Sequence, residues 1–223
     1  MNQLPLPFDH APRYGLDDFM PSASNDDALA AIERWPAWPD RVLLLVGPEG
    51  AGKSHLARIW AARADADLLG PRDLAGDLDL LVRRNAVVED ADRAGLPEAA
   101  LFHLLNLVRE RGLSLLVTAR SAPTGWSLAT ADLTSRLRLA PSVEIAPPDD
   151  ALMRAVLVKL FADRQLAVDA ALVDWLALRL DRSLDSARRA VAALDRAGLD
   201  AGRRITRSLA ADLFGDPQEG RGA

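Results

Sequence analysis

Short apolar runs alternate with longer, mixed stretches between residues 41 and 146. Five runs predict buried strands, the second of them the weakest: Val42–Val46, Asp67–Leu69, Ala86–Val88, Leu113–Thr118 and Val143–Ile145. One stretch between them places Leu101, Leu104, Leu105 and Val108 on one face of a helix, which we interpret as core. Buried strands that alternate with helices are typical of a parallel sheet covered by helices, so we predict an α/β fold.

The pattern changes at Pro147-Pro148, which ends the last predicted strand. Asp149 and Asp150 then provide a cap and favourable charge for a helix. No strand pattern follows, and apolar residues recur at helical spacing in the segments 152–160, 172–176, 184–194 and 209–213. We predict an α/β domain over 13–147, a small all-α domain over 148–215 and a flexible tail over 216–223.

A glycine-rich loop follows the first predicted strand directly, with the sequence Gly47-Pro48-Glu49-Gly50-Ala51-Gly52-Lys53-Ser54. A helix-compatible stretch, His55–Ala64, comes next, and a strand-loop-helix context is what a phosphate-binding loop requires. Small residues let backbone N–H groups converge on an anion, and the helix adds its positive end. Lys53 would reach the β- and γ-phosphates, and Ser54 would hold Mg²⁺. An ordinary glycine-rich turn is the alternative.

Two adjacent carboxylates, Glu89 and Asp90, end the predicted strand Ala86–Val88. At this place in a nucleotide-binding sheet, carboxylates hold Mg²⁺ through water and polarise an attacking water. A capped strand end is the alternative, but the nearby phosphate loop favours catalytic acids, with Glu89 as a metal ligand. Typical motor ATPases have Asp before Glu. The inverted order here predicts weak hydrolysis.

Three arginines are candidates for contact with phosphate. Arg120 follows the fourth strand, where a polar residue usually senses the γ-phosphate; a solvated side chain is the alternative. Arg136, in a short helical turn, can act in trans on the ATP of a neighbour, because a guanidinium neutralises charge that develops in phosphoryl transfer; a surface arginine that is only solvated is the alternative. Arg188 could reach a phosphate of the nucleotide. The alternative for this helix is a surface ion pair between Asp185 and Arg189, worth about 0.3–0.5 kcal/mol.

The N-terminus carries Gln3-Leu4-Pro5-Leu6-Pro7-Phe8 within an extended segment over 1–12. Proline lowers the entropy that such a segment loses on docking, and its apolar side chains can fill pockets of a partner. We interpret Gln3, Leu4, Leu6, Pro7 and Phe8 as partner-binding. Folding back onto the domain is the alternative.

Composition narrows these options. The 223 residues contain no Cys and three His, which excludes disulfides and argues against zinc sites. The apolar runs are far shorter than the ~20 residues of a membrane-spanning helix, and no signal sequence is present, so we predict a soluble cytoplasmic protein without a membrane partner. A net charge of −5 argues against wrapping nucleic acid over the whole surface.

Together these motifs resemble the DnaA-related AAA+ proteins over nearly the whole chain. Six segments carry the resemblance: Gln3–Phe8, similar to the sliding-clamp-binding peptide of the family; Tyr14–Asn25, with Phe19 and Asn25 near the adenine; the phosphate loop followed by His55-Leu56; Leu116–Thr118 at sensor 1; Ser135-Arg136-Leu137 in the arginine-finger box; and Leu180–Arg182 before the sensor 2 helix.

The resemblance implies an AAA+ P-loop sheet with helices on both faces, followed by a helical lid. It also implies bound ADP or ATP with Mg²⁺, with Phe19, Asn25 and His55 in the nucleotide site. Residues 3–8 would tether the protein to the DNA polymerase sliding clamp, and Arg136 would act on ATP held by DnaA. The expected function is therefore regulation of replication initiation, without sequence-specific DNA binding.

Two positions depart from the family. Arg120 stands where sensor 1 commonly has Asp, and Asp185 stands where sensor 2 commonly has Arg, with Arg188 one turn later as the replacement. A stand-alone P-loop enzyme such as a small-molecule kinase, and a helicase-loader-like protein that contacts single-stranded DNA, are the alternative functions. The sequence leaves open the preference between ADP and ATP, and whether copies of the chain assemble.

Overall fold

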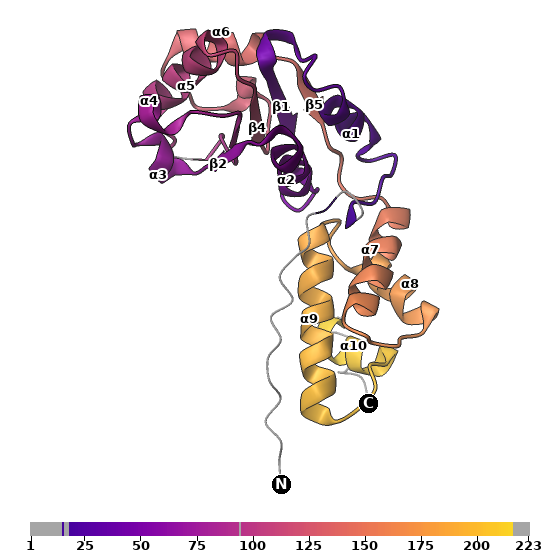
Figure 1. Ribbon diagram of the computed structural model, residues 1–223. Helices are drawn as coiled ribbons and strands as arrows, with labels where there is room; N and C mark the ends of the chain where they lie inside the picture. Colours follow the sequence, from indigo (N-terminus) through magenta and orange to yellow (C-terminus); the bar gives the residue numbers. More distant parts are fainter. Residues whose placement is uncertain (1–14, 16–17, 94, 216–223) are drawn as a thin grey trace.

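One five-stranded sheet organises the N-terminal two thirds of the chain (Figure 1). The computed structural model describes residue 15 and residues 18–93 and 95–215. All strand pairs are parallel, in the order β2-β3-β4-β1-β5. The strands are β1 (Val42–Val46), β2 (Asp67–Leu69), β3 (Ala86–Val88), β4 (Leu115–Ala119) and β5 (Ser142–Glu144). Because parallel strands end at one edge, the loops after β1, β3 and β4 meet there.

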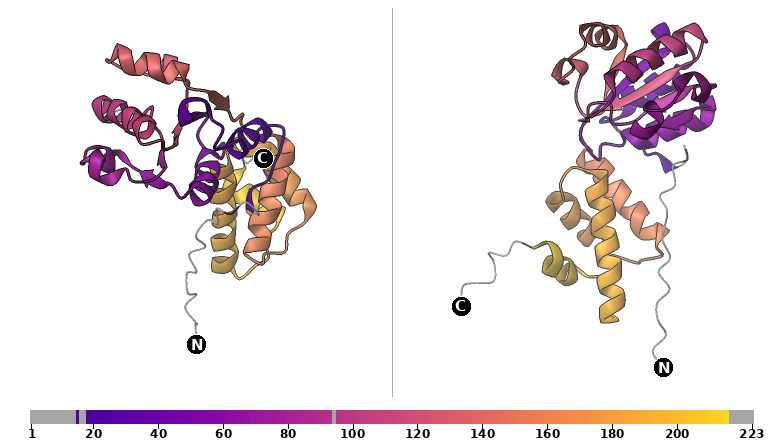
Figure 2. Two further views of the ribbon diagram at one scale, coloured as in Figure 1. Left: turned by 45° about the horizontal axis from the view of Figure 1, so that its top comes forward. Right: turned by 90° about the vertical axis from the view of Figure 1, so that its left-hand side faces the viewer.

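Helices cover both faces of the sheet (Figures 1 and 2). The face with α1 (Asp26–Glu33) and α2 (Lys53–Ala64) buries Leu43 and Leu45 of β1. The opposite face buries Val42, Leu44 and Val46, which alternate with them along the strand. On that face lie α3 (Pro71–Leu74), α4 (Leu78–Leu81), α5 (Glu98–Glu110) and α6 (Ala131–Leu139). Burial on both faces explains why β1 is a continuous apolar run.

The predicted helix face of Leu101, Leu104, Leu105 and Val108 is confirmed as core, since all four are buried on α5. Two predicted strands had ends that were wrong by one or two residues, and β4 is Leu115–Ala119 rather than 113–118. The N–H of Leu113 donates to the carbonyl of Val108 beyond Gly112, whose φ is +66°, so Leu113 closes the end of α5 and β4 begins at Leu115. The last strand is Ser142–Glu144 rather than 143–145, and the N–H of Ile145 donates to the carbonyl of Val46.

Four helices follow the sheet and form their own core (Figure 2). They are α7 (Asp150–Asp163), α8 (Ala170–Arg179), α9 (Leu184–Ala201) and α10 (Arg207–Phe214), and we call them the lid. The carboxylate of Asp149 accepts the N–H of Leu152 at 2.7 Å, which is the predicted N-cap of α7. The predicted fold class, a parallel sheet with helices on both faces and a small all-α part, is confirmed.

Short 3-10 turns at Pro39–Arg41 and Pro123–Gly125 complete the described elements. Within residues 15, 18–93 and 95–215, no helix is both long and apolar enough to span a membrane. The predicted peptide over 1–12, with Gln3, Leu4, Leu6, Pro7 and Phe8, and the predicted tail over 216–223 lie outside the described residues.

Candidate functional site

The loop between β1 and α2 has a backbone that requires glycine. Gly50 and Gly52 have φ angles of +73° and +108°, which side-chain-bearing residues rarely adopt. A Cβ on Gly47 would overlap the carbonyl oxygen of Ile145. The backbone geometry therefore requires glycine at three positions of the predicted loop. The loop leads into the N-terminal end of α2, where backbone N–H groups favour an anion.

Lys53 folds back over this loop. Its Nζ donates to the carbonyls of Gly47 at 2.7 Å and Pro48 at 2.9 Å, and only 6% of the residue is exposed. Burial lowers the pKa of the Lys53 ammonium, Asp90 and Asp92 oppose this effect, and Arg120 adds to it. The Lys53 ammonium thus lies near both negatively and positively charged side chains, and a phosphate would give it a direct counter-charge.

A charged cavity of about 260 Å³ opens over the loop. It is lined by the loop and α2 residues Glu49, Gly50, Gly52, Lys53, Ser54, His55 and Arg58, by Asp90, Arg93 and Arg120 near the strand ends, and by Leu184, Asp185 and Arg188 of α9. The predicted residues Gly47, Pro48 and Ala51 do not line this cavity: Gly47 and Pro48 hold Lys53 through their carbonyls, and Ala51 is buried in the core.

The lid makes one side of this cavity by direct contact with the loop. The N–H of Leu184, the first residue of α9, donates to the carbonyl of Gly50 at 2.8 Å. A Cβ on Gly50 would overlap the Ser183 hydroxyl and lie 2.9 Å from Ser183 Cβ. The N-terminal end of α9 therefore packs closely on the phosphate loop, below α2 in Figure 1.

A second, more apolar cavity of about 410 Å³ lies between the segment before α1 and the lid. The predicted residues Phe19, Asn25 and His55 line it together with Leu152 and Val156 of α7. Phe19 and His55 meet edge to face, with ring centroids 5.4 Å apart. Burial lowers the pKa of the His55 imidazole, so the ring is neutral at pH 7 and suits an uncharged neighbour.

Asn25 lines this cavity and supports the backbone turn beside it. It is 3% exposed; its Oδ1 accepts the N–H of Ser22 at 2.9 Å, and its Nδ2 donates to the carbonyl of Met20 at 3.0 Å. These bonds fix the turn that carries Phe19 into the cavity. Asn25 therefore holds the backbone of this turn in place beside the cavity.

His55, Leu184 and Arg188 line both cavities, so the two are adjacent parts of one site. Arg188 Nη1 donates to Asp185 Oδ1 at 2.9 Å, so Asp185 pairs with Arg188 rather than with Arg189, the partner in the alternative interpretation. Arg189 is exposed and lines only the apolar cavity. An apolar cavity that leads into a charged one matches the shape and polarity of a nucleotide.

The carboxylates after β3 take different positions. Asp90 lines the charged cavity, has a φ of +53°, donates its N–H to Thr118 Oγ1 at 3.0 Å and pairs with Arg93 at 2.9 Å. Glu89 does not line that cavity, and its Oε1 is buried with no hydrogen-bond partner among the described residues. The side chain of Asp92 is also buried. We did not predict Asp92 as a site residue, although its place as the third acid in the run Glu89-Asp90-Ala91-Asp92 could have indicated it.

Mg²⁺ fits this donor set only as a partner of phosphate. In the described part of the chain, no three His, Cys, Asp or Glu side chains lie close enough to hold a metal. Ser54 and Asp90 do line one cavity, and Mg²⁺ typically takes one or two protein oxygens and completes its shell with phosphate and water. Glu89 would take part only through water or after a side-chain rearrangement.

Arg136 lies apart from both cavities, on the sheet face covered by α5 and α6. Its Nη1 donates to Asn106 Oδ1 at 2.6 Å, and its guanidinium carbon lies 4.7 Å from the ring centroid of Phe102. Both partners belong to α5. The side chain is thus held in place and half-buried, and it lines neither of the two cavities.

No protein-family model matches this sequence, and no curated protein sequence does so either. Solved structures do match. Domain III of the replication initiation protein DnaA from Thermotoga maritima is similar with a TM-score of 0.77 and 17% identity, over 93% of this chain and 99% of that one. This chain has the AAA+ fold.

Other solved structures with the AAA+ fold are also similar to this chain. AMPPCP-bound DnaA from Aquifex aeolicus has a TM-score of 0.71 at 15% identity, over 85% of this chain and 67% of that one. The Thermotoga maritima RuvB Holliday junction branch migration motor has a TM-score of 0.70 at 18% identity, over 93% of this chain and 76% of that one. The chain spans about two thirds of such longer DnaA chains. At these identities the likeness concerns the fold.

Proposed function

We propose that this chain is a regulator of bacterial replication initiation of the Hda type, which binds an adenine nucleotide with Mg²⁺ and stimulates ATP hydrolysis by DnaA. The observation that carries the proposal is the paired cavity between the phosphate loop and the lid. The AMPPCP bound to a DnaA of the same fold supports an adenine nucleotide there.

The nucleotide serves mainly to order the protein. Of the two carboxylates that follow β3, Asp90 lines the charged cavity and is already paired with Arg93, whereas Glu89 does not line it and has a buried Oε1. Neither carboxylate is therefore set up as a general base for water in this arrangement. Binding energy from the phosphates and the base would instead fix the lid against the loop through Leu184 and Gly50.

Arg136 is the group offered to the partner. Phe102 and Asn106 hold its side chain in one orientation, which limits the entropy lost when it meets a second protein. A guanidinium brought to ATP in a neighbouring protein neutralises charge in the transition state, an effect worth about 10³–10⁵ in rate in the best-known cases. The partner that completes the site is DnaA, and the peptide Gln3–Phe8 brings the chain to the sliding clamp.

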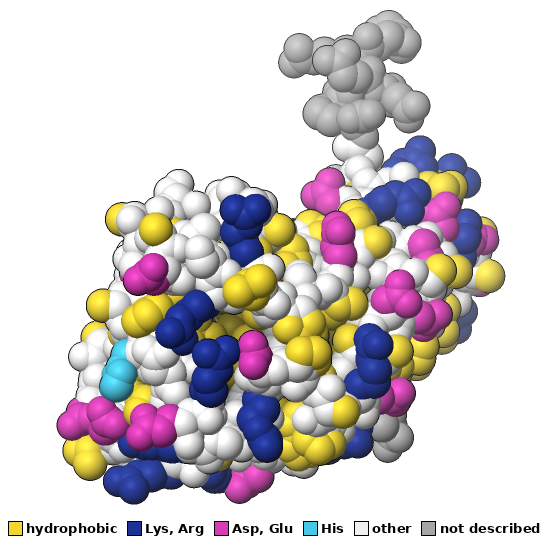
Figure 3. All heavy atoms as spheres, turned by 90° about the horizontal axis from the view of Figure 1, so that it is seen from above, with side chains coloured by type: hydrophobic (Ala, Val, Ile, Leu, Met, Phe, Trp, Pro, Cys, Tyr) yellow, Lys and Arg dark blue, Asp and Glu magenta, His cyan; other side chains and the backbone are white. Residues whose placement is uncertain are grey.

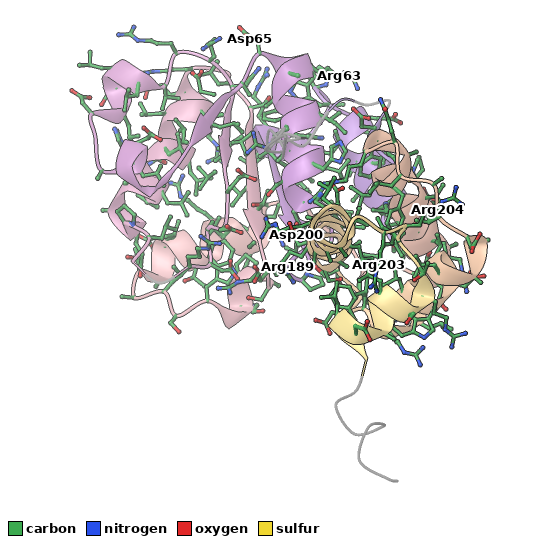
Figure 4. The ribbon with its side chains drawn as sticks, turned by 90° about the horizontal axis from the view of Figure 1, so that it is seen from below. Arg63, Asp65, Arg189, Asp200, Arg203 and Arg204 are labelled. Atoms are coloured by element: carbon green, nitrogen blue, oxygen red, sulfur yellow. The ribbon has the colours of Figure 1, made fainter. Side chains whose placement is uncertain are left out.

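The two alternatives have less support. A small-molecule kinase would need a second substrate site beside the phosphates, and the apolar cavity is of a size for one nucleoside. A helicase loader would need a basic, aromatic groove for single-stranded DNA. Figure 3 shows basic, acidic and hydrophobic side chains interspersed on the upper face, and Figure 4 shows the acidic Asp200 as well as the basic Arg203 and Arg204 around the C-terminal end of α9.

The test follows loss of ATP from ATP-bound DnaA in the presence of clamp-loaded DNA and the intact chain. We expect stimulation by the wild-type chain and its loss, by about 100-fold or more, with Arg136→Ala. Arg138→Ala, on the same helix as Arg136, is the matched control for Arg136→Ala. A Gln3→Ala/Phe8→Ala variant should fail to bind the clamp. Undiminished ATP loss with Arg136→Ala removes this residue from the mechanism, and unchanged clamp affinity of the double variant removes the tether.

A further inference from the structure

The lid contains a further cavity that is separate from the nucleotide site. It has a volume of about 360 Å³ and lies between the loop that joins α7 to α8 and the C-terminal end of α9. None of the residues that line it lines either of the two cavities described above. We call it the lid groove and define it by six of its lining residues, Leu166, Asp195, Leu199, Arg203, Arg204 and Ile205.

Both walls of the lid groove are helix ends that backbone hydrogen bonds hold in place. Beyond α7, Gln165 has a φ of +57°, and the N–H of Leu166 donates back to the last turns of the helix at 2.9 Å. Beyond α9, Gly202 has a φ of +58°, and the N–H of Arg203 donates to the carbonyl of Gly198 at 3.1 Å. Such helix ends fix the direction of the chain that follows. A ligand would therefore meet a groove that is already formed, and little entropy would be lost in ordering it.

The lining of the lid groove combines apolar side chains with two cations. Leu166 and Ile205 are partly buried against the core of the lid, whereas Leu199 is 64% exposed. Arg203 and Arg204 are both exposed, and neither guanidinium forms an ion pair or a hydrogen bond within the described part of the chain. The groove thus offers an apolar surface next to two positive charges that have no counter-charge.

These charges make the lid groove locally positive on a chain whose net charge is −5. The carboxylate that lines the groove, Asp195, pairs with Arg164 at 3.7 Å, so it is already compensated. Figure 4 shows Asp200 near Arg203 and Arg204 at the end of α9, but Asp200 does not line the groove. A local positive site on an acidic protein attracts negatively charged ligands.

We propose that the lid groove docks a short acidic segment of a partner protein, with one apolar side chain against Leu199 and Ile205 and carboxylates on Arg203 and Arg204. A guanidinium binds a carboxylate through two parallel hydrogen bonds, which gives such a pair both strength and direction. Nucleic acid fits this lining less well, because no aromatic side chain on which a base could stack is among the described residues that line the groove. The proposal goes beyond the proposed function, since it requires no nucleotide.

The experiment titrates labelled nonapeptides with the intact chain and follows fluorescence anisotropy. The probe has a central Leu flanked by Glu, and a second peptide has Lys in place of every Glu. We expect saturable binding of the acidic peptide alone, and a loss of at least about 10-fold in Arg203→Gln/Arg204→Gln, because two charged hydrogen-bonding groups are removed. Arg63→Gln/Arg138→Gln makes the same charge change at two exposed arginines outside the groove and should bind as the wild type does. No saturable binding by the wild-type chain, or equal loss in both double variants, overturns the proposal.

A second pair of variants tests the apolar contact separately from charge. Leu199→Ala should weaken the acidic peptide at least about 3-fold, and should not change binding of the same peptide with Ser in place of its Leu, because only the Leu loses buried apolar contact. Leu178→Ala, at a leucine of α8 that is 68% exposed and outside the groove, should change neither. An equal effect of Leu199→Ala on both peptides overturns the apolar contact. Binding of oligothymidine that depends on Arg203 and Arg204, with acidic peptide unaffected by their substitution, would instead identify a nucleic-acid surface and overturn the proposal.

Discussion

Gly50→Ala tests whether the lid rests on the phosphate loop. The new methyl group would overlap the Ser183 hydroxyl, lie 2.9 Å from Ser183 Cβ and sit on a residue with a φ of +73°. The left-handed backbone costs about 1–2 kcal/mol for a residue with a side chain. Separating the surfaces also breaks the hydrogen bond from Leu184 to Gly50, worth about 0.5–1.5 kcal/mol. The total is about 1.5–3.5 kcal/mol.

Two further variants divide this cost. Gly112→Ala has a similar φ of +66° and nothing within 4 Å of its Cβ, so it should show the backbone cost alone. Gly50→Ala/Ser183→Gly removes the overlap and should recover the rest. The assays are chemical denaturation and hydrogen exchange of the Leu184 amide. Equal destabilisation by Gly50→Ala and Gly112→Ala, with the Leu184 amide equally protected in both, would refute the lid contact.

Two other predictions concern ion contacts. Glu98 accepts the N–H groups of Ala129 and Thr130, each at 2.9 Å, just before the helix that carries Arg136. These bonds lower the Glu98 pKa, so their stabilisation is present above the ordinary value of 4.5 and is lost as the pH falls through the folded pKa. Glu98→Gln should speed exchange of both amides at pH 7, whereas Glu110→Gln on the same helix should not; equal exchange would contradict the contact. Lys159 bonds Asp163 within α7 and Asp18 of the segment before α1, each at 2.9 Å. These bonds raise the Lys159 pKa, so their stabilisation is present below the ordinary value of 10.5 and is lost as the pH rises through the folded pKa. Asp18→Asn should cost about 0.2–1 kcal/mol in thermal unfolding at pH 7, less in high salt, and an effect that grows with salt would contradict an ion pair.

The strands show what a single sequence can determine. β1 and β3 end where the apolar runs end, because a strand buried on both faces requires an unbroken run. The edge strand β2 leaves Leu68 exposed, which is why its run is the weakest in the sequence. β4 begins two residues late because Leu113, although apolar, closes the turn at Gly112. That turn depends on a helix end and a positive φ, and the periodicity of apolar residues does not reveal it.

The phosphate loop was equally visible in the sequence, because its glycines are required by local backbone geometry. The partners of the loop were not. Asp92 lies under Arg120 only because β3 and β4 are adjacent, and Lys159 reaches Asp18 only because the lid packs beside the segment before α1. Such pairs depend on the tertiary arrangement, which one sequence does not encode in any spacing.

Direct titration of the intact chain with ADP and with ATP, each with Mg²⁺, tests the central claim that the loop and the lid hold one nucleotide. We expect saturable binding at one site per chain and a loss of at least about 10-fold in Lys53→Ala, since the ammonium is the buried cation at the loop. Arg138→Ala, away from both cavities, should bind as the wild type does. No binding by the wild-type chain, or equal affinity in Lys53→Ala, would contradict the account.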